Sequence, residues 1–297
     1  NTLTEYFGVH DGVLNYVLAY FLLGNSLGTL IEPCIEASWG MRKLVILTSS
    51  LLTVGCASCY FMRHIFFGER IGLVIVGLSQ GIIQCPLAKL CASWFCANGR
   101  TKATTIALTM NNFGIGVAYI LPGLYWDGLV GFGRLRVLHL CIAGSLLLAT
   151  IVFFEEKPPI APSLSAELMF KSELSREKPS SFTETLAMLR TYWWNSFCLF
   201  SVPGFFSIVS ISIGDVMVSY LSTIYLTQTL QNDFTDSDLM RTLVGIGYYV
   251  PSVFVGAAAA SLIDHFKVKR PTTTYMTSLH AGCLISILSC TMIVNAL

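Results

Sequence analysis

Long apolar runs alternate with short polar connections along the whole of the sequence. A transmembrane helix needs about 20 consecutive apolar residues. Runs of that kind lie at 11–33, 44–62, 71–92, 103–122, 136–154, 196–226, 242–263 and 272–294. The pattern therefore predicts an all-α polytopic membrane protein with about eight transmembrane helices.

The composition supports a membrane protein. Of the 297 residues, 54% are hydrophobic and 12% are charged, whereas an average soluble domain carries about 25% charged residues. The net charge of +1 gives no reason to expect a nucleic-acid partner, and we expect none. The ten cysteines lack metal-site spacing, and neither a G-x-x-x-x-G-K-S/T loop nor a nucleophile constellation occurs. We therefore expect a protein that is not an enzyme and that has no resident cofactor or metal.

The connections differ in charge, and the difference predicts their side of the membrane. Alternate connections divide the basic residues into a set of twelve and a set of five, the five being Arg63, Arg70, Arg134, Arg136 and Arg241. Connections rich in lysine and arginine stay in the cytoplasm, so the longest connection, 155–195, is expected there. Lys89 lies near the cytoplasmic end of its span, and we expect its ammonium group to snorkel to the interface.

The connection at 155–195 also divides the sequence. We expect an N-terminal half at 1–154 and an incomplete C-terminal half at 196–297, joined by a cytoplasmic linker. The first part of this linker is rich in proline, serine and charge, which is typical of a flexible segment. Its end, 181–194, carries a capping box and apolar residues at helical spacing. That end forms either a short interfacial helix or the start of the sixth span.

Two short loops resemble each other. The segments "IEPCIEASWGMRK" at 31–43 and "SLIDHFKVKRP" at 261–271 both place an acidic residue ahead of basic residues in a tight connection. Corresponding loops in two halves are typical of an internally duplicated carrier. They resemble the G-x-x-x-D-R/K-x-G-R-R/K motif of the major facilitator superfamily. The resemblance implies structural or gating roles for Gly40, Arg42 and Asp264.

A more specific resemblance begins at residues 79–123, "SQGIIQCPLAKLCASWFCANGRTKATTIALTMNNFGIGVAYILPG". This segment is similar to the feline leukaemia virus subgroup C receptor-related family, which has W-F-x-x-N-x-R before a helix with G-N-Q-L-G-I and a closing L-P. Residues 215–230, "DVMVSYLSTIYLTQTL", resemble helix 7 of that family. In this register the spans are helices 2 to 9 of twelve. The resemblance implies a major-facilitator-type bundle, present here as a fragment or a shortened gene product.

Two adjacent asparagines stand inside the apolar run at 103–122. Asn111 lies with Gly114 on a stripe of small residues, where a carboxamide would make an interhelical hydrogen bond that fixes the packing. Asn112 points about 100° away, towards the side that holds Tyr119. The resemblance aligns Asn112 with a family glutamine implicated in substrate binding, which implies a ligand of the cavity.

The run at 196–226 has a polar face. Its members recur at the spacing of one side of a helix: Ser212, Asp215, Ser219 and Ser222. A carboxylate deep within a span indicates a cavity or a proton path, and Asp215 is our candidate; the alternative is a buried aspartate that neighbouring serines satisfy. Pro203 and Gly204 are expected to break or bend the start of this helix, as in carrier helices near a binding site.

The resemblance also implies a substrate class. Members of the family carry choline and ethanolamine, and haem has also been proposed. A quaternary ammonium group binds the faces of aromatic rings. Ser219 aligns with the family's cage tyrosine and Tyr220 is adjacent, while Tyr248 is either a further ring of the cage or a packing residue. Asp215 would add a formal charge that attracts a cation.

These patterns together predict a secondary transporter of a small organic solute that works by alternating access. We expect a monomeric, multi-pass protein whose partners are the lipid bilayer and the small-molecule substrate. The plasma membrane is the expected location, with an organelle membrane as the alternative. The competing hypothesis is a transport-inactive receptor or scaffold that retains the fold, or a truncated gene product.

Overall fold

The computed structural model describes residues 7–8, 16–96, 99–125, 128–174 and 182–202, with further positions at 204–206, 209–210, 213, 254, 258 and 261. These segments contain helices and no strand, which agrees with the predicted all-α class. The helices are α3 (Val17–Trp39), α4 (Met41–Phe61), α5 (Phe66–Gln84), α6 (Leu87–Trp94), α7 (Arg100–Tyr125), α8 (Gly128–Phe153), α9 (Leu164–Leu174), α10 (Phe182–Cys198) and the 3-10 helix η1 (Leu199–Ser201).

Four helical stretches in this part of the chain are long and apolar enough to cross a membrane. They are Val17–Trp39, Met41–Phe61, Phe66–Trp94 and Val130–Phe153. With 26 residues, α7 also has the length of a span, because a helix rises about 1.5 Å per residue and the hydrocarbon core is about 30 Å thick. The five spans predicted up to residue 154 therefore coincide with α3 to α8. Of the three predicted spans after residue 195, the structure describes residues 196–202 at the start of the first and otherwise only isolated positions.

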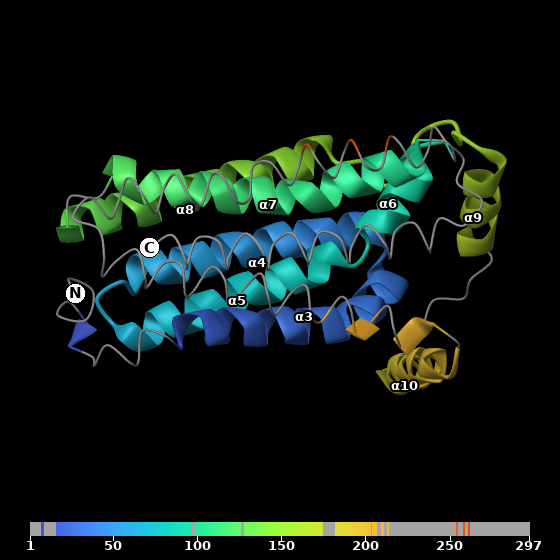
Figure 1. Ribbon diagram of the computed structural model, residues 1–297, viewed down its shortest axis with the longest axis horizontal. Helices are drawn as coiled ribbons and strands as arrows, with labels where there is room; N and C mark the ends of the chain where they lie inside the picture. Colours follow the sequence, from blue (N-terminus) through green and yellow to red (C-terminus); the bar gives the residue numbers. More distant parts are fainter. Residues whose placement is uncertain are drawn as a thin grey trace, which may run out of the picture.

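The long helices run side by side and form one bundle (Figure 1). α5 lies at its centre, packed closely against α3 on one side and α4 on the other, and α4 in turn packs against α8. α7 makes few contacts with α6 and α8. We call the end of the bundle that carries Gly40, Lys89 and α9 the inner end, and the opposite end the outer end.

Glycines allow the backbones of α3 and α5 to touch. Gly24 and Gly28 on α3 face α5, and Gly77 and Gly81 on α5 face α3. A methyl group added at any of these four glycines would overlap a carbonyl oxygen of the opposite helix. Each pair has the small-xxx-small spacing that permits close approach in a membrane, where association depends on van der Waals packing.

Short polar side chains connect α4 to its neighbours. The Ser79 hydroxyl of α5 donates to the carbonyl of Thr48 at 2.8 Å. On the other side of α4, the Thr53 hydroxyl donates to the carbonyl of Ala143 in α8 at 3.1 Å, and the Ser49 and Thr150 hydroxyls lie 3.2 Å apart. Hydrogen bonds of this kind stabilise contacts between apolar helices in a medium without water.

Pro86 separates α5 from α6. Proline has no backbone N–H and its ring clashes with the preceding turn of a helix, so α5 ends at Gln84 and α6 begins at Leu87. The break redirects the chain within the stretch Phe66–Trp94 that counts as one span. It places Lys89 at the inner end of the bundle, beside α3 and α9.

The start of the connection after α8 is more ordered than the sequence predicts. Residues 164–174 form α9, which the composition had indicated to be flexible. Ser163 caps this helix, because its hydroxyl accepts a hydrogen bond from the backbone N–H of Ala166 at 3.3 Å. Glu167 and Lys171 form an ion pair of 2.7 Å one turn apart. The helix predicted at 181–194 is present as α10.

The location of α9 leads to our first prediction. Ser172 is exposed on α9, so a Ser172→Cys variant in a cysteine-free background should escape a membrane-impermeant thiol reagent added outside cells. The same reagent should react once the membrane is permeabilised. Ile65→Cys, in the exposed connection between α4 and α5, should react from outside and is the matched control. Efficient external labelling at position 172 would invert the predicted topology.

Candidate functional site

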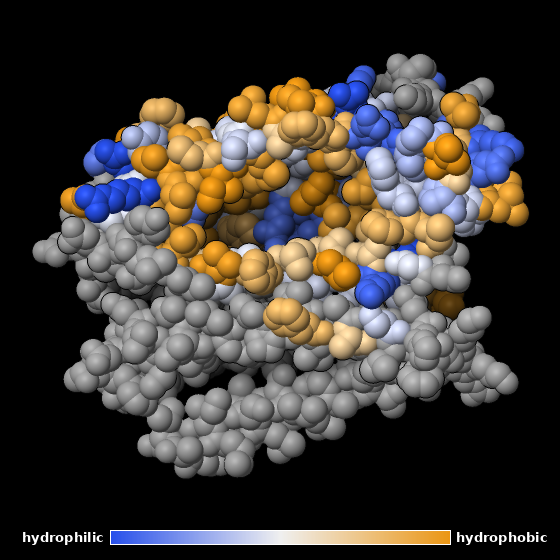
Figure 2. All heavy atoms as spheres, turned by 90° about the horizontal axis from the view of Figure 1, so that it is seen from above, coloured by the Kyte–Doolittle hydropathy of each residue, from blue (hydrophilic) through white to orange (hydrophobic). Residues whose placement is uncertain are grey.

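A hydrogen bond joins the candidate helix α7 to the centre of the bundle. The side-chain amide of Gln80 on α5 donates to Oδ1 of Asn111 on α7 at 3.4 Å. Figure 2 looks down on the face of α7 and α8 and shows a hollow with hydrophilic atoms at its floor and hydrophobic residues around its rim. A polar floor in an apolar setting is the arrangement that small-molecule sites use to orient a ligand.

The structure says less about the other predicted residues of α7. The backbone of Asn112 and Tyr119 lies in the helix, while their side chains lie outside what the structure describes. Gly114 is exposed, and no described atom lies within 4 Å of the position that a Cβ would take. The cavity role of Asn112 and the packing role of Gly114 therefore stay predictions.

Most candidates in the second half of the chain fall outside the described residues. These are Pro203, Asp215, Ser219, Tyr220, Tyr248 and Asp264, and their roles stay predictions. Gly204 is described, and its φ of 87° is a conformation that residues with a side chain rarely adopt. The positive φ lies next to the predicted break at Pro203.

Gly40 forms the turn between α3 and α4. Its φ of 81° places it in a region open mainly to glycine, and its N–H bonds the carbonyl of Glu36 at 2.9 Å. The first N–H of α4, at Met41, donates to a carboxylate oxygen of Glu156 at 3.1 Å. A negative charge at a helix N-terminus is favourable. Arg42 is exposed beside this turn, and its gating role stays a prediction.

Four charged side chains form an ion cluster at the inner end. Lys89 of α6 is paired with Glu36 of α3 and, at 2.7 Å, with Glu173 of α9. Lys157 is paired with the same Glu173 at 2.6 Å. The expectation that Lys89 snorkels to the interface stays a prediction, and the structure adds that carboxylates from two other helices hold its ammonium group.

The charge state of α9 is set by these lysines. Burial would raise the pKa of Glu173, but hydrogen bonds from Lys157 and Lys89 outweigh it and lower that pKa. A hydrogen bond from Lys171 likewise lowers the pKa of Glu167. A lowered pKa means that the pairs are complete at neutral pH and are lost only as pH falls through the lowered value.

The outer end holds an ion pair and a second arginine that contacts aromatic residues. Arg136 of α8 is paired with Glu69 of α5, whose carboxylate is buried. Arg70 donates to the Tyr20 hydroxyl of α3 at 3.3 Å and lies 4.8 Å from the ring centroid of Phe66. These contacts connect α5 to α8 and to α3. Arginines that the sequence places in outer connections thus hold helices together.

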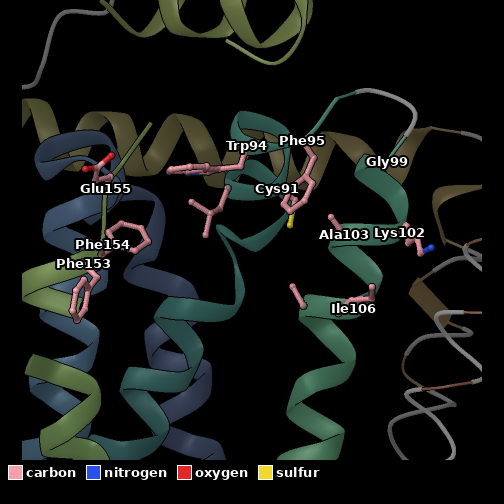
Figure 3. Close-up of a pocket in the computed structure, with 12 residues that line it drawn as sticks. Cys91, Trp94, Phe95, Gly99, Lys102, Ala103, Ile106, Phe153, Phe154 and Glu155 are labelled. Atoms are coloured by element: carbon pink, nitrogen blue, oxygen red, sulfur yellow. The ribbon is translucent and has the colours of Figure 1, made fainter. Parts of the chain in front are cut away.

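An apolar cavity of about 740 Å³ lies at the inner end, between α6, α7 and the end of α8. Figure 3 shows four aromatic side chains around it: Trp94 at the end of α6, Phe95 just after it, Phe153 at the end of α8 and Phe154 just after it. Ala103 lies on the facing side of α7. Asn111 and Gln80 are not among its lining residues. The cavity is therefore separate from the polar contact between α5 and α7.

Several charged residues of the bundle were not identified as candidates from the sequence. The predicted span at 11–33 places Glu32 at its end, whereas α3 continues to Trp39 and Glu32 lies within it, 5% exposed. The sequence feature that could have identified Glu32 is an acidic residue inside an apolar run. Glu36 and Lys89 carried a weaker signal, because nothing in the local sequence shows that α3 and α6 meet.

The features of the bundle define a class of protein. It contains packed apolar helices of membrane-spanning length, glycine contacts between backbones, and ion pairs at both ends, which together describe a multi-pass helical membrane protein. The chain belongs to the Major Facilitator Superfamily, whose sequence profile matches residues 1–297. This confirms the fold class and the family predicted from the sequence.

Curated relatives share low identity with the chain. The human "Choline/ethanolamine transporter FLVCR2" is 22% identical over 185 residues, covering 57% of this chain and 34% of that protein. The "Uncharacterized MFS-type transporter C09D4.1" of Caenorhabditis elegans is 24% identical over 286 residues, covering 92% and 46%. The "Probable metabolite transport protein CsbC" of Bacillus subtilis is 24% identical over 283 residues, covering 86% and 56%. The chain thus spans about a third to somewhat over half of their lengths.

Proposed function

We propose that this protein is a secondary transporter that moves a small organic solute by alternating access, and that it is not an enzyme. The observation that carries the proposal is the match to the Major Facilitator Superfamily over the whole chain. The relatives named above as transporters are consistent with it. In carriers with repeated halves, the substrate binds near the middle of the membrane between the halves.

The proposed substrate site combines residues of α7 with residues after α10. Asn112 and Tyr119 of α7 would meet Asp215, Ser219 and Tyr220 across the cavity, with Tyr248 beside them. Asn111 belongs to the same helix, and its hydrogen bond to Gln80 fixes α7 against α5. We propose that this bond positions Asn112, because the two residues are adjacent in one helix.

The proposed substrate is a small amino alcohol such as choline or ethanolamine. Three features favour a cation of this size: a carboxylate at Asp215, aromatic rings at Tyr220 and Tyr248, and a carboxamide at Asn112. A carboxylate and ring faces both attract an ammonium group, while a carboxamide binds a hydroxyl. The name of the human relative agrees with this class.

We further propose that the connections at the inner end take part in gating. Gly40 and Arg42 would act in the first half and Asp264 in the second, with Pro203 and Gly204 bending the helix that carries Asp215. The tight turn at Gly40 and the positive φ of Gly204 support these roles, since both are backbone features that a side chain would disturb. We propose a monomer in the plasma membrane.

Uptake by cells tests the proposal. Cells that express the full-length protein should take up radiolabelled choline or ethanolamine in a saturable way, above cells with an empty vector. Excess unlabelled substrate should suppress the added component. Surface-expressed protein without added uptake of either tracer would favour the competing hypothesis of a receptor or scaffold. That hypothesis draws support from Ala37, which stands where the loop motif has an aspartate.

A further inference from the structure

Glu32 is a buried carboxylic acid in the inner half of a membrane-spanning helix. It is 5% exposed in α3, about two turns from the inner end of that helix. Its Oε1 atom has no hydrogen-bond partner among the described residues. A carboxylate without a partner is very costly in hydrocarbon, and such a group takes up a proton instead of remaining charged.

Among the described residues, the cation that acts on Glu32 is Lys89, and Lys89 is already paired with two other carboxylates. The charged groups of the described helices that act on Glu32 are Glu36, one turn further along α3, and Lys89 of α6. Glu32 also acts electrostatically on the thiols of Cys34 and Cys85. Lys89 is paired with Glu36 and with Glu173 of α9.

A charge balance distinguishes the two protonation states of Glu32. Glu36 and Glu173 carry two negative charges, and Lys89 and Lys157 carry two positive charges, all of them ion-paired. The cluster is therefore neutral when Glu32 holds a proton. Loss of that proton adds an uncompensated charge, and Lys89 is the cation of the described helices whose charge acts on Glu32. Attraction of Lys89 towards Glu32 competes with the ion pair that holds α9.

We propose that Glu32 is a proton-binding site at the inner end of the bundle, linked through Lys89 to the docking of α9. With the proton bound, Lys89 bridges Glu36 and Glu173, and α9 rests against α6. Without the proton, Lys89 shifts to Glu32 and α9 loosens. The binding step is reversible transfer of one proton between water and a carboxylate oxygen, with no other bond made or broken. The proposal goes beyond the transport function and does not depend on it.

Infrared difference spectroscopy of the purified full-length protein tests proton binding. When the pH is changed from acid to alkaline, the wild type should lose a carboxylic acid C=O band. The Glu32→Gln variant should lack this band, and Glu32→Asp should restore one at a shifted frequency. Glu167→Gln is the matched control, because Glu167 is an exposed carboxylate paired within α9, and it should retain the wild-type band. A wild type without the band, or a band unchanged in Glu32→Gln, would overturn the proposal.

A spin label on α9 tests the linkage. Leu168 is 59% exposed on α9, so a label at Leu168→Cys should report the mobility of α9 without disturbing Glu173. The label should become more mobile as pH rises in the wild type and in Glu167→Gln. It should show no pH response in Glu32→Gln. A pH response that persists in Glu32→Gln would show that another group controls α9 and would contradict the linkage. Neither readout uses a substrate, so failure of the transport proposal leaves this test unaffected.

Discussion

Replacement of Gly81 by leucine is expected to remove most of the folded protein from the membrane. A Cβ at this position would overlap the carbonyl oxygen of Asn25, a backbone atom of α3 that cannot rotate aside. Over-packing costs about 1–3 kcal/mol when neighbouring side chains can adjust. Since the obstacle here is backbone, we expect a loss at the top of that range or above it. Even Gly81→Ala should lower thermal stability clearly.

Gly144 provides the control for this prediction. It lies in α8, and no described atom is within 4 Å of the position of its Cβ. Gly144→Leu and Gly144→Ala should therefore give near wild-type amounts of monodisperse protein. Fluorescence-detected size-exclusion chromatography of tagged protein measures both yield and melting temperature. Equal yields of Gly81→Leu and Gly144→Leu would show that α3 and α5 do not touch through their glycines.

The sequence was sufficient to predict that the described part of the chain consists of long apolar helices, because length and apolarity alone decide whether a helix can cross a membrane. It did not reveal which helices are neighbours. The packing role of Gly114 on α7 stays a prediction, and the close backbone contacts seen at glycines of the described region join α5 to α3 and to α4. Gly24 and Gly28 have small-xxx-small spacing in the sequence, but spacing alone does not identify the partner of a small-residue face.

The sequence also did not reveal the partners of the charged residues. The sequence predicts Lys89 to be an interfacial lysine, and it does not show that α9 lies beside it. The polar composition of α9 predicts a flexible linker there, whereas the structure has a helix. Its order comes from an N-cap at Ser163 and from ion pairs of Glu173 with Lys157 and with the distant Lys89. Glu32 was missed for a local reason: α3 continues to Trp39, beyond the predicted end of its apolar run at residue 33, so a residue predicted at the end of the span lies inside the helix.

Substitution of Asp215 by asparagine is expected to abolish most transport while leaving the protein in the membrane. If Asp215 lines the cavity, its carboxylate either pairs with a cationic substrate or carries a coupling proton. Both roles require a group that can be charged, and an amide of the same shape fills neither. Ser212→Ala is the matched control one turn away, because it removes one hydrogen bond of about 1 kcal/mol and no charge. It should reduce transport by roughly fivefold at most.

Exchange experiments separate the two roles of Asp215. A coupling carboxylate should leave exchange of internal for external substrate intact in Asp215→Asn and abolish accumulation. A substrate-pairing carboxylate should abolish both, with a rise in apparent KM before a fall in kcat. If Asp215→Asn transports like the wild type at every pH, the residue is structural and the assignment of its helix to the cavity is wrong.

Counterflow in proteoliposomes tests the central claim, transport by this protein, most directly. Cells have their own carriers for amino alcohols, whereas liposomes contain only the purified full-length protein. Liposomes loaded with unlabelled choline and diluted into tracer choline should accumulate tracer transiently, in a saturable way, because a carrier exchanges internal for external molecules and the outward gradient of unlabelled choline drives tracer entry. The same should hold with ethanolamine. Tracer entry no faster than into protein-free liposomes, for both compounds, would contradict the assignment of a choline or ethanolamine carrier.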